Sequence, residues 1–430
     1  MEGATVIELV NQKASPAVLF VSWQGGLGHI MRDIAIAREL RAVRPNVRID
    51  WLAHPLGGRI LLEEGETLMP ESACSADYNE IGAAKALDGF RLSLAKYVYH
   101  GRKAWHANAL LFEEVTKNLS FDLIVGDEIY EVRDAIAAGV VKVRAPTVII
   151  HDFFGSLAMS RNPLELLFVH LRNRRAVGVY ERGPASALTH FFVGELEDIP
   201  DESFGFLLPN KRKLAEKLMT FLGYIVRFNP AEYQDVAAMK ARMGLGSEPL
   251  VVCATGGTSA GFELLELCAK AYEIMKASIP NLRMICVHGE LFGRSLPALP
   301  CGVEVRKYVP KIYELYAASD LAIVVGGGTT TLELTALRRP FVYFPLEGQF
   351  DQCVYISERL ARQQAGIRML YSRTTPSLLA DVGLANIFRP PVWPPIRCDG
   401  ARTAALLLDR MLRAVPDACR PESARQAERQ

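Results

Sequence analysis

Apolar positions follow two different spacings along the chain. Residues 17–21 form an unbroken apolar run, whereas the segment after it, up to Pro45, has apolar residues three and four positions apart. A short apolar run next to glycines indicates a buried strand, and the second spacing indicates a helix with one buried face. Another strand-like run follows at residues 47–53. A strand, a glycine turn, a helix and a further strand are typical of a parallel sheet covered by helices.

The same alternation returns through both halves of the chain. In the first half it predicts strands at residues 17–21, 47–53, 122–126, 145–150 and 188–194, and helices at 83–117 and 162–175. In the second half it predicts strands at 250–254, 284–288, 303–307, 321–325 and 341–345, and helices at 262–276, 311–319, 330–337 and 351–363. The sequence therefore predicts an α/β fold of two Rossmann-like domains that face each other across a cleft.

The alternation of strands and helices is interrupted at residues 227–249, where proline and glycine residues favour turns and loops. This interruption separates the two halves of the chain. A chain of 430 residues is also longer than one ordinary core supports. The predicted division is an N-terminal domain at 1–228, a second domain at 229–400, a helix at 401–415 that packs back on the first domain, and a disordered tail at 416–430.

The composition narrows the class of protein. Half of the residues are hydrophobic and 23% are charged, which is typical of a packed globular protein, and the net charge of +1 argues against a nucleic-acid partner. Residues 1–14 lack the basic start and apolar core of a secretion signal. Eight scattered cysteines, with no Cys-x-x-Cys pair, argue against a disulfide framework or a zinc site. We therefore expect a cytoplasmic protein.

Three glycine clusters follow predicted strands. They are Gly25-Gly26-Leu27-Gly28-His29, Gly256-Gly257-Thr258 and Gly326-Gly327-Gly328-Thr329-Thr330-Thr331. Ligands of such sheets bind where the helices begin, and glycine lets backbone N–H groups approach a phosphate there. One such turn alone is equally explained by tight-turn geometry, but three at matching positions predict a nucleotide-binding cleft. None matches the dinucleotide fingerprint or a P-loop.

Acidic and amide side chains accompany the third cluster. Glu333, early in the following helix, can accept hydrogen bonds from ribose hydroxyls, or it is only an acid favoured by the helix dipole. Asp351 and Gln352 follow the last predicted strand and suit the hydroxyls of a sugar. The alternative for Asp351 is a helix N-cap.

The second half carries a resemblance to a known family. Segments 307–320, 326–333 and 339–352 resemble the donor domain of inverting GT-B glycosyltransferases of family 28, which includes the peptidoglycan N-acetylglucosaminyltransferase. The plant and antibiotic glycosyltransferases are more distantly similar. The first two glycine clusters, and Gly223-x-x-x-Arg227 between the domains, resemble further motifs of the family. The resemblance implies a GT-B fold with the donor nucleotide in the second domain and the acceptor on the first.

The resemblance also implies a set of donor-binding residues. They are Gly26, Gly28, Arg227, Gly257, Thr258, Val309, Gly328, Thr329, Thr330, Thr331, Glu333, Asp351 and Gln352. Within this set, Val309 would contact the uracil, Glu333 the ribose and Gln352 the sugar. Two positions depart from the relatives: Val325 replaces a phosphate-binding His of the plant branch, and Phe154 replaces an Asn of the cell-wall enzyme. These departures leave the sugar and the acceptor open.

Transfer of a sugar with inversion requires a base for the acceptor hydroxyl and a positive environment for the departing diphosphate. His29 is the first candidate for the base, and Asp127 can orient and charge-stabilise it. The alternatives are a His29 that contacts phosphate or backbone and an Asp127 that is only a cap, with Glu128 and Glu131 as neighbouring carboxylates. The chain has no Asp-x-Asp, so we expect neither a metal nor a cofactor besides the donor.

Three functions remain open from the sequence. The first is transfer of a sugar from a UDP- or TDP-sugar to a hydroxyl of a small molecule or lipid. The second is a nucleotide-sugar 2-epimerase on the same scaffold, and the third is a non-catalytic nucleotide-sugar binder. Segment 164–179 is apolar and then basic, which fits either a helix on a membrane surface or an ordinary core-facing helix.

Overall fold

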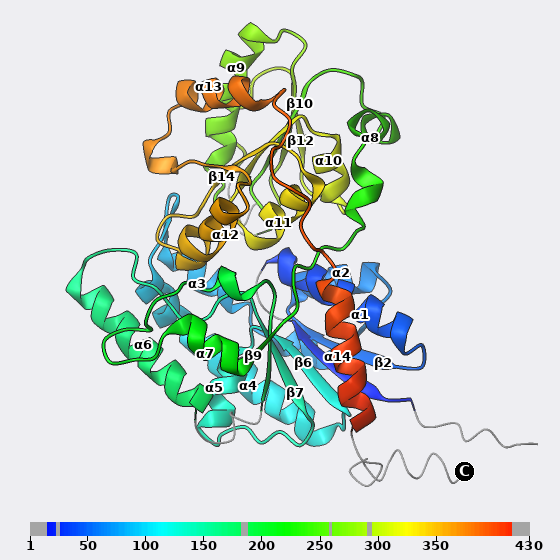
Figure 1. Ribbon diagram of the computed structural model, residues 1–430, viewed down its shortest axis with the longest axis vertical. Helices are drawn as coiled ribbons and strands as arrows, with labels where there is room; N and C mark the ends of the chain where they lie inside the picture. Colours follow the sequence, from blue (N-terminus) through cyan, green and yellow to red (C-terminus); the bar gives the residue numbers. More distant parts are fainter. Residues whose placement is uncertain (1–14, 23–25, 182–187, 258–259, 290–294, 415–430) are drawn as a thin grey trace, which may run out of the picture.

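The computed structural model describes residues 15–22, 26–181, 188–257, 260–289 and 295–414, and it has two lobes (Figure 1). Each lobe is built on a parallel sheet. The N-terminal sheet has the strand order β3-β2-β1-β6-β7-β8-β9, and the C-terminal sheet has the order β12-β11-β10-β13-β14-β15. Helices cover both faces of each sheet, which confirms the predicted fold class. The predicted tail at 416–430 and the segment 1–14 lie outside the described residues.

The strands of the N-terminal lobe are mostly buried on both faces, which explains their continuous apolar runs. They are β1 (Ala17–Ser22), β2 (Arg48–Ala53), β3 (Thr67–Leu68), β6 (Leu123–Asp127), β7 (Thr147–His151), β8 (Thr189–Phe192) and β9 (Met219–Phe221). Helices of this lobe are α1 (Leu27–Val43), α2 (Pro55–Glu63), α3 (Tyr78–Ala86), α4 (Leu94–Asn118), α5 (Tyr130–Ala137), α6 (Pro163–Glu181) and α7 (Lys211–Leu218).

The C-terminal lobe repeats this layered arrangement around two apolar clusters, one on each face of its sheet. Its strands are β10 (Leu250–Ala254), β11 (Arg283–Val287), β12 (Val303–Arg306), β13 (Leu321–Val325), β14 (Phe341–Phe344) and β15 (Ile367–Arg368). Its helices are α8 (Val236–Arg242), α9 (Leu264–Ser278), α10 (Ile312–Ala318), α11 (Gly328–Leu337), α12 (Ser357–Arg362) and α13 (Pro376–Asn386). A π-helix at Asp351–Ile356 leads directly into α12.

The last helix, α14 (Gly400–Ala414), lies against α1 of the N-terminal lobe (Figure 1). Its buried residues Ala404 and Leu408 belong to the same apolar cluster as Ile34 of α1. Nε of Arg44 also donates to Oδ1 of Asp409 at 2.6 Å. The chain therefore crosses between the lobes twice, and after the second crossing α14 packs against the first lobe.

The helix predicted at residues 83–117 is wrong as a single element. Residues 87–93 leave the helical path and form a hairpin of β4 (Leu87–Asp88) and β5 (Arg91–Leu92), with Gly89 at a φ of 53° in the turn. The hairpin reaches the other lobe: N of Leu92 donates to O of Glu347 at 2.7 Å, and Phe90 is buried in the C-terminal core. This contact between lobes overrides a local sequence pattern that favours a helix.

Candidate active site

A cavity of about 940 Å³ lies between the two lobes, and glycine loops from both sides form its middle. A Cβ atom at Gly28 would lie 2.4 Å from Oγ1 of Thr329 at the start of α11. A Cβ atom at Gly257 would lie 2.8 Å from Cγ of Leu27 at the start of α1. Because neither position has room for a side chain, glycine allows the N-terminus of α1 to approach both the N-terminus of α11 and the loop after β10.

The structure brings most of the predicted site residues to this cavity. Its lining includes Gly26, Gly28, His29, Gly257, Gly328, Thr329, Thr330, Asp351 and Gln352. Five predicted residues do not line it: Asp127, Arg227, Val309, Thr331 and Glu333. Thr258 lies outside the described residues.

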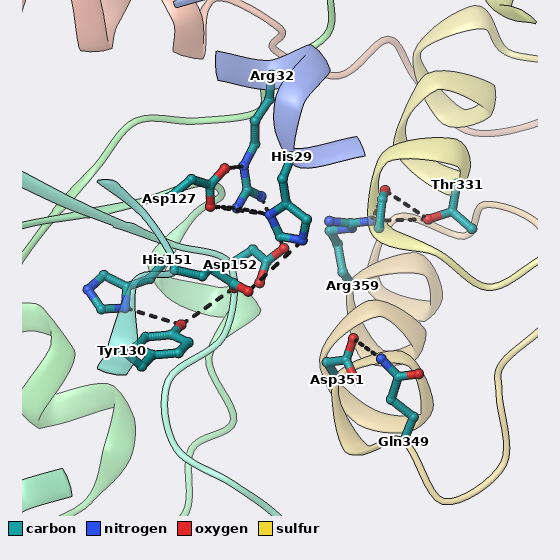
Figure 2. A network of polar contacts seen from close by, with 12 residues as sticks. His29, Arg32, Asp127, Tyr130, His151, Asp152, Thr331, Gln349, Asp351 and Arg359 are labelled. Carbon is teal, nitrogen blue, oxygen red and sulfur yellow. Dashed lines mark hydrogen bonds and ion pairs between the residues drawn. The ribbon is translucent and has the colours of Figure 1, made fainter. Parts of the chain in front are cut away.

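His29, which lines the cavity, lies beside Asp127, which does not (Figure 2). Nδ1 of His29 is 3.2 Å from Oδ1 of Asp127, the last residue of β6. Arg32, one turn further along α1, donates from Nε to Oδ2 of Asp127 at 2.6 Å and from Nη2 to Oδ1. Burial alone would raise the pKa of Asp127, but the positive charges of Arg32 and His29 outweigh it and lower this pKa. Asp127 is therefore an anion at neutral pH.

The Nδ1 atom of His29 has two competing partners. Nη2 of Arg32 lies 2.9 Å from it, and Oδ1 of Asp127 lies 3.2 Å from it. A guanidinium only donates, so the contact with Arg32 requires the proton of a neutral imidazole on Nε2; the carboxylate only accepts, so the contact with Asp127 requires it on Nδ1. Only the second tautomer leaves a lone pair on Nε2 with which His29 can accept a proton.

Three further carboxyl groups, those of Glu128, Asp152 and Asp351, line the cavity near His29 and Asp127. Burial, followed by the charge of Asp152, raises the pKa of Glu128. Burial would also raise the pKa of Asp152, but the charge of Arg32, whose Nη1 donates to Oδ2 of Asp152 at 3.0 Å, lowers it to about 2. On the other side of the cleft, burial and the charge of Asp152 raise the pKa of Asp351 to about 7. At neutral pH Asp152 is therefore ionised.

The start of α11 presents positive charge to the cavity. Nη2 of Arg359, from α12, donates to O of Gly328 and to Oγ1 of Thr331, both at 3.3 Å. No ion pair of Arg359 occurs among the residues that the structure describes. The guanidinium thus adds to the unpaired N–H groups and the dipole of the helix N-terminus, a combination that favours an anion.

Thr331 does not face the cavity, contrary to the expectation from the sequence. Its hydroxyl donates back to O of Gly327 at 2.9 Å, within the first turn of α11. Of the three threonines, Thr329 and Thr330 line the cavity.

Arg227 and Glu333 pair with each other behind the donor loop. Nε of Arg227 donates to Oε1 of Glu333 at 3.1 Å, and its Nη1 donates to O of Pro310 at 3.2 Å. Burial raises the pKa of Glu333 and outweighs the charge of Arg227. The contact with Pro310 places the pair beside Val309, so the residues expected to hold the base, ribose and phosphates lie close together.

The amide of Gln352 is engaged with the protein. Its Oε1 accepts from N of Leu346 at 2.8 Å, and its Nε2 donates to Oε1 of Gln349 at 3.3 Å. Asp351 is the first residue of the π-helix rather than its N-cap. Its Oδ2 accepts from Nε2 of Gln349 at 3.1 Å. Gln352 therefore shapes the loop, and the carboxyl group of Asp351 lines the cavity.

Comparison with known proteins adds to this geometry. Residues 251–391, which carry the donor loop, match the model of the glycosyltransferase family 28 C-terminal domain. The second half of the chain is therefore similar to that domain. Two curated relatives, both named UDP-N-acetylglucosamine–N-acetylmuramyl-(pentapeptide) pyrophosphoryl-undecaprenol N-acetylglucosamine transferase, are similar to the chain. The protein of Carboxydothermus hydrogenoformans is 30% identical over 112 residues, 25% of this chain and 30% of that protein.

The protein of Symbiobacterium thermophilum is 25% identical over 181 residues, 39% of this chain and 48% of that protein. The matched part thus spans about a third to a half of the length of these relatives. The crystal structure of the kitacinnamycin glycotransferase is similar over 96% of this chain and 99% of its own, at 17% identity and a TM-score of 0.57. This likeness shows the GT-B fold.

The described residues contain neither a cluster of metal ligands nor a membrane-spanning helix. No three His, Cys, Asp or Glu side chains within this part of the chain gather as ligands for a metal ion. Within the same residues, no helix is long and apolar enough to cross a membrane.

Two site residues, Arg32 and Arg359, were missed by the reasoning from sequence. Arg32 lies one helical turn after His29, so the i, i+3 spacing on one helix face signals that the two side chains meet. Arg359 gives no such signal, because the direction of its side chain depends on the π-helix before α12, which changes the helix face on which later residues lie.

Proposed function

We propose that the protein is an inverting, metal-independent glycosyltransferase that uses a UDP- or TDP-sugar and no other cofactor. The observation that carries this proposal is the placement of His29 in one cavity with the start of α11. A candidate base from one lobe thereby faces a candidate diphosphate site from the other. The named activity of the two curated relatives favours UDP over TDP.

The reaction follows from these positions. With Nδ1–H donating to Asp127, Nε2 of His29 takes the proton of the acceptor hydroxyl while its oxygen forms a bond to C1 of the sugar. The bond from C1 to the diphosphate oxygen breaks, and its electron pair leaves with the nucleoside diphosphate. The α11 N-terminus and Arg359 stabilise this negative charge. Attack from the side opposite the leaving group inverts C1.

The acceptor is a hydroxyl of a small molecule or a lipid, and α6 favours contact with a lipid surface. Leu164, Leu167 and Phe206 are 76%, 54% and 81% exposed. Asn173 of α6 donates to O of Phe204 at 2.8 Å, so the loop with Phe206 lies against α6. Exposed Arg174 on α6 adds positive charge, as in helices that lie on anionic membranes. Contact at the inner face of the cytoplasmic membrane would bring lipid hydroxyls to the cavity.

The experiment is product analysis with UDP-glucose, UDP-N-acetylglucosamine and TDP-glucose, each with and without a panel of phenolic and lipid alcohols. We expect a mass increase of one sugar on an alcohol, release of the nucleoside diphosphate, and loss of both in His29→Ala. A sugar isomerised at C2 without any alcohol would identify an epimerase. No turnover by wild type, with retained binding of the nucleotide, would identify a binding protein.

A further inference from the structure

The cavity extends into the N-terminal lobe between α4, α5 and α6, away from the donor loops. Its walls there include the apolar side chains Leu94, Val98, Trp105, Phe168, Leu171 and Ala176, and charged side chains of α4 and α5 also line the cavity. All of these apolar residues come from α4 and α6 of the N-terminal lobe. We call it the α4–α6 chamber.

Arg172 of α6 lines this chamber without a carboxylate partner. Its Nε donates to Oγ of Ser156 at 2.9 Å, and no ion pair within the described residues includes it. Two neighbouring arginines differ, because Arg133 and Arg175 lie 2.7 and 3.6 Å from the carboxylate of Asp134. Burial lowers the pKa of Arg172, and the positive charge of Arg133 lowers it further. The guanidinium is therefore a cation without a direct ion pair among the described residues, and the negative charge of Asp134 offsets its charge only in part.

The same guanidinium is held in a fixed orientation. Ser156, which accepts from its Nε, is itself buried, and its backbone exchanges hydrogen bonds with the side chain of Asn173 at 2.9 Å in both directions. A half-buried cation without a counter-ion is costly, and a guanidinium fork fits a carboxylate or phosphate with two hydrogen bonds. The arrangement thus has the features of an anion site prepared in advance.

We propose that Arg172 binds an anionic group of the acceptor, so that the acceptor is an amphipathic molecule with an apolar body and a carboxylate or phosphate. This proposal rests on the proposed function and adds the chemical class of the acceptor. The apolar walls take the body of the molecule, and Arg172 fixes its acid group. The reacting hydroxyl then lies toward His29, at the other end of the same cavity.

The test uses two fluorescent probes with one ring system. Anilinonaphthalene sulfonate carries an anion, and N-phenylnaphthylamine is the same body without it. Binding of both is measured by fluorescence titration with saturating UDP, for wild type, Arg172→Gln and Arg174→Gln. Arg174 is the matched control, because it lies on the same helix, is exposed and does not line the cavity.

We expect Arg172→Gln to weaken binding of the sulfonate about 10-fold or more, as loss of a charge-assisted hydrogen bond does, and to leave the neutral probe unchanged. Arg172→Lys keeps the charge but not the guanidinium fork, so its affinity for the sulfonate should lie between those of wild type and Arg172→Gln.

Equal losses of affinity for both probes, or no loss for the sulfonate, would overturn the proposal. The proposal would also be overturned if Arg172→Gln weakened only the binding of UDP-glucuronate and not that of UDP-glucose, because the acid group would then belong to the donor. If the wild-type protein does not bind UDP, the proposed function is wrong. The two probes can still be compared without UDP, so the role of Arg172 is tested separately.

Discussion

The guanidinium of Arg32 donates to both carboxylate oxygens of Asp127. This pairing keeps Arg32 occupied and leaves Asp127 able to accept the Nδ1 proton of His29, 3.2 Å away. The aspartate therefore has two tasks in the proposed mechanism. It favours the tautomer of His29 that has its proton on Nδ1. It also binds Arg32, whose donation to Nδ1 would favour the tautomer with the proton on Nε2.

Asp127→Asn tests this relationship. The amide no longer binds Arg32 as an ion pair, so Arg32 donates to Nδ1 of His29 and forces the proton onto Nε2. We expect kcat for sugar transfer to fall about 100-fold or more, with UDP affinity within about 2-fold of wild type. Adding Arg32→Gln removes the competing donor and should restore part of the rate. Equal rates for Asp127→Asn and wild type in single-turnover kinetics would contradict the role of the pair.

Arg359 is expected to bind the diphosphate rather than the nucleoside. Arg359→Gln should weaken binding of UDP about 10-fold or more and leave binding of uridine unchanged, since only UDP carries the charge. Isothermal titration of both ligands measures the difference, and Arg373→Gln, an exposed arginine of the same lobe, is the control. A parallel loss for uridine and UDP would show that Arg359 only supports the turn of α11.

Glu333 is expected to recognise the ribose. Wild type should bind UDP more tightly than deoxyuridine diphosphate, and Glu333→Gln should reduce that preference by about 10-fold, because a charged acceptor of the hydroxyl is lost. Competition binding with both nucleotides gives the two affinities. An unchanged preference would leave Glu333 as only the partner of Arg227.

Asp351 makes stability depend on pH near neutrality. Its pKa rises from an ordinary 3.8 to about 7 in the folded protein, through burial and the charge of Asp152. The folded state therefore binds this proton more tightly than the unfolded state, so the stability linked to it is lost progressively as pH rises from 3.8 to about 7. Asp351→Asn should raise Tm at both pH values, and by more at pH about 8.5 than at pH about 5.5, where only part of this stability has been lost. Thermal melts across this range measure it, and an equal shift at both values would argue against this titration.

Much of the fold could be read from the sequence because its strands are buried on both faces and appear as apolar runs. The break at Gly89 could not, since the hairpin is stabilised by contacts of Phe90 with the other lobe. The glycine loops were visible from spacing, and the pairing of His29 with Asp127 was expected. The position of Arg359 depends on a π-helix. The lack of an ion pair at Arg172 depends on the pairing of Asp134 with the neighbouring arginines. Such features arise from tertiary contacts that no local pattern records.

The most direct test of the central claim is a thermal-shift titration of the protein with UDP, TDP, GDP, ADP and CMP. A ligand that binds only the folded state raises Tm by an amount that grows with its affinity. We predict that UDP or TDP raises Tm and that the other three nucleotides do not. No shift with any nucleotide, or a shift with ADP alone, would contradict a donor site at Gly328 to Glu333.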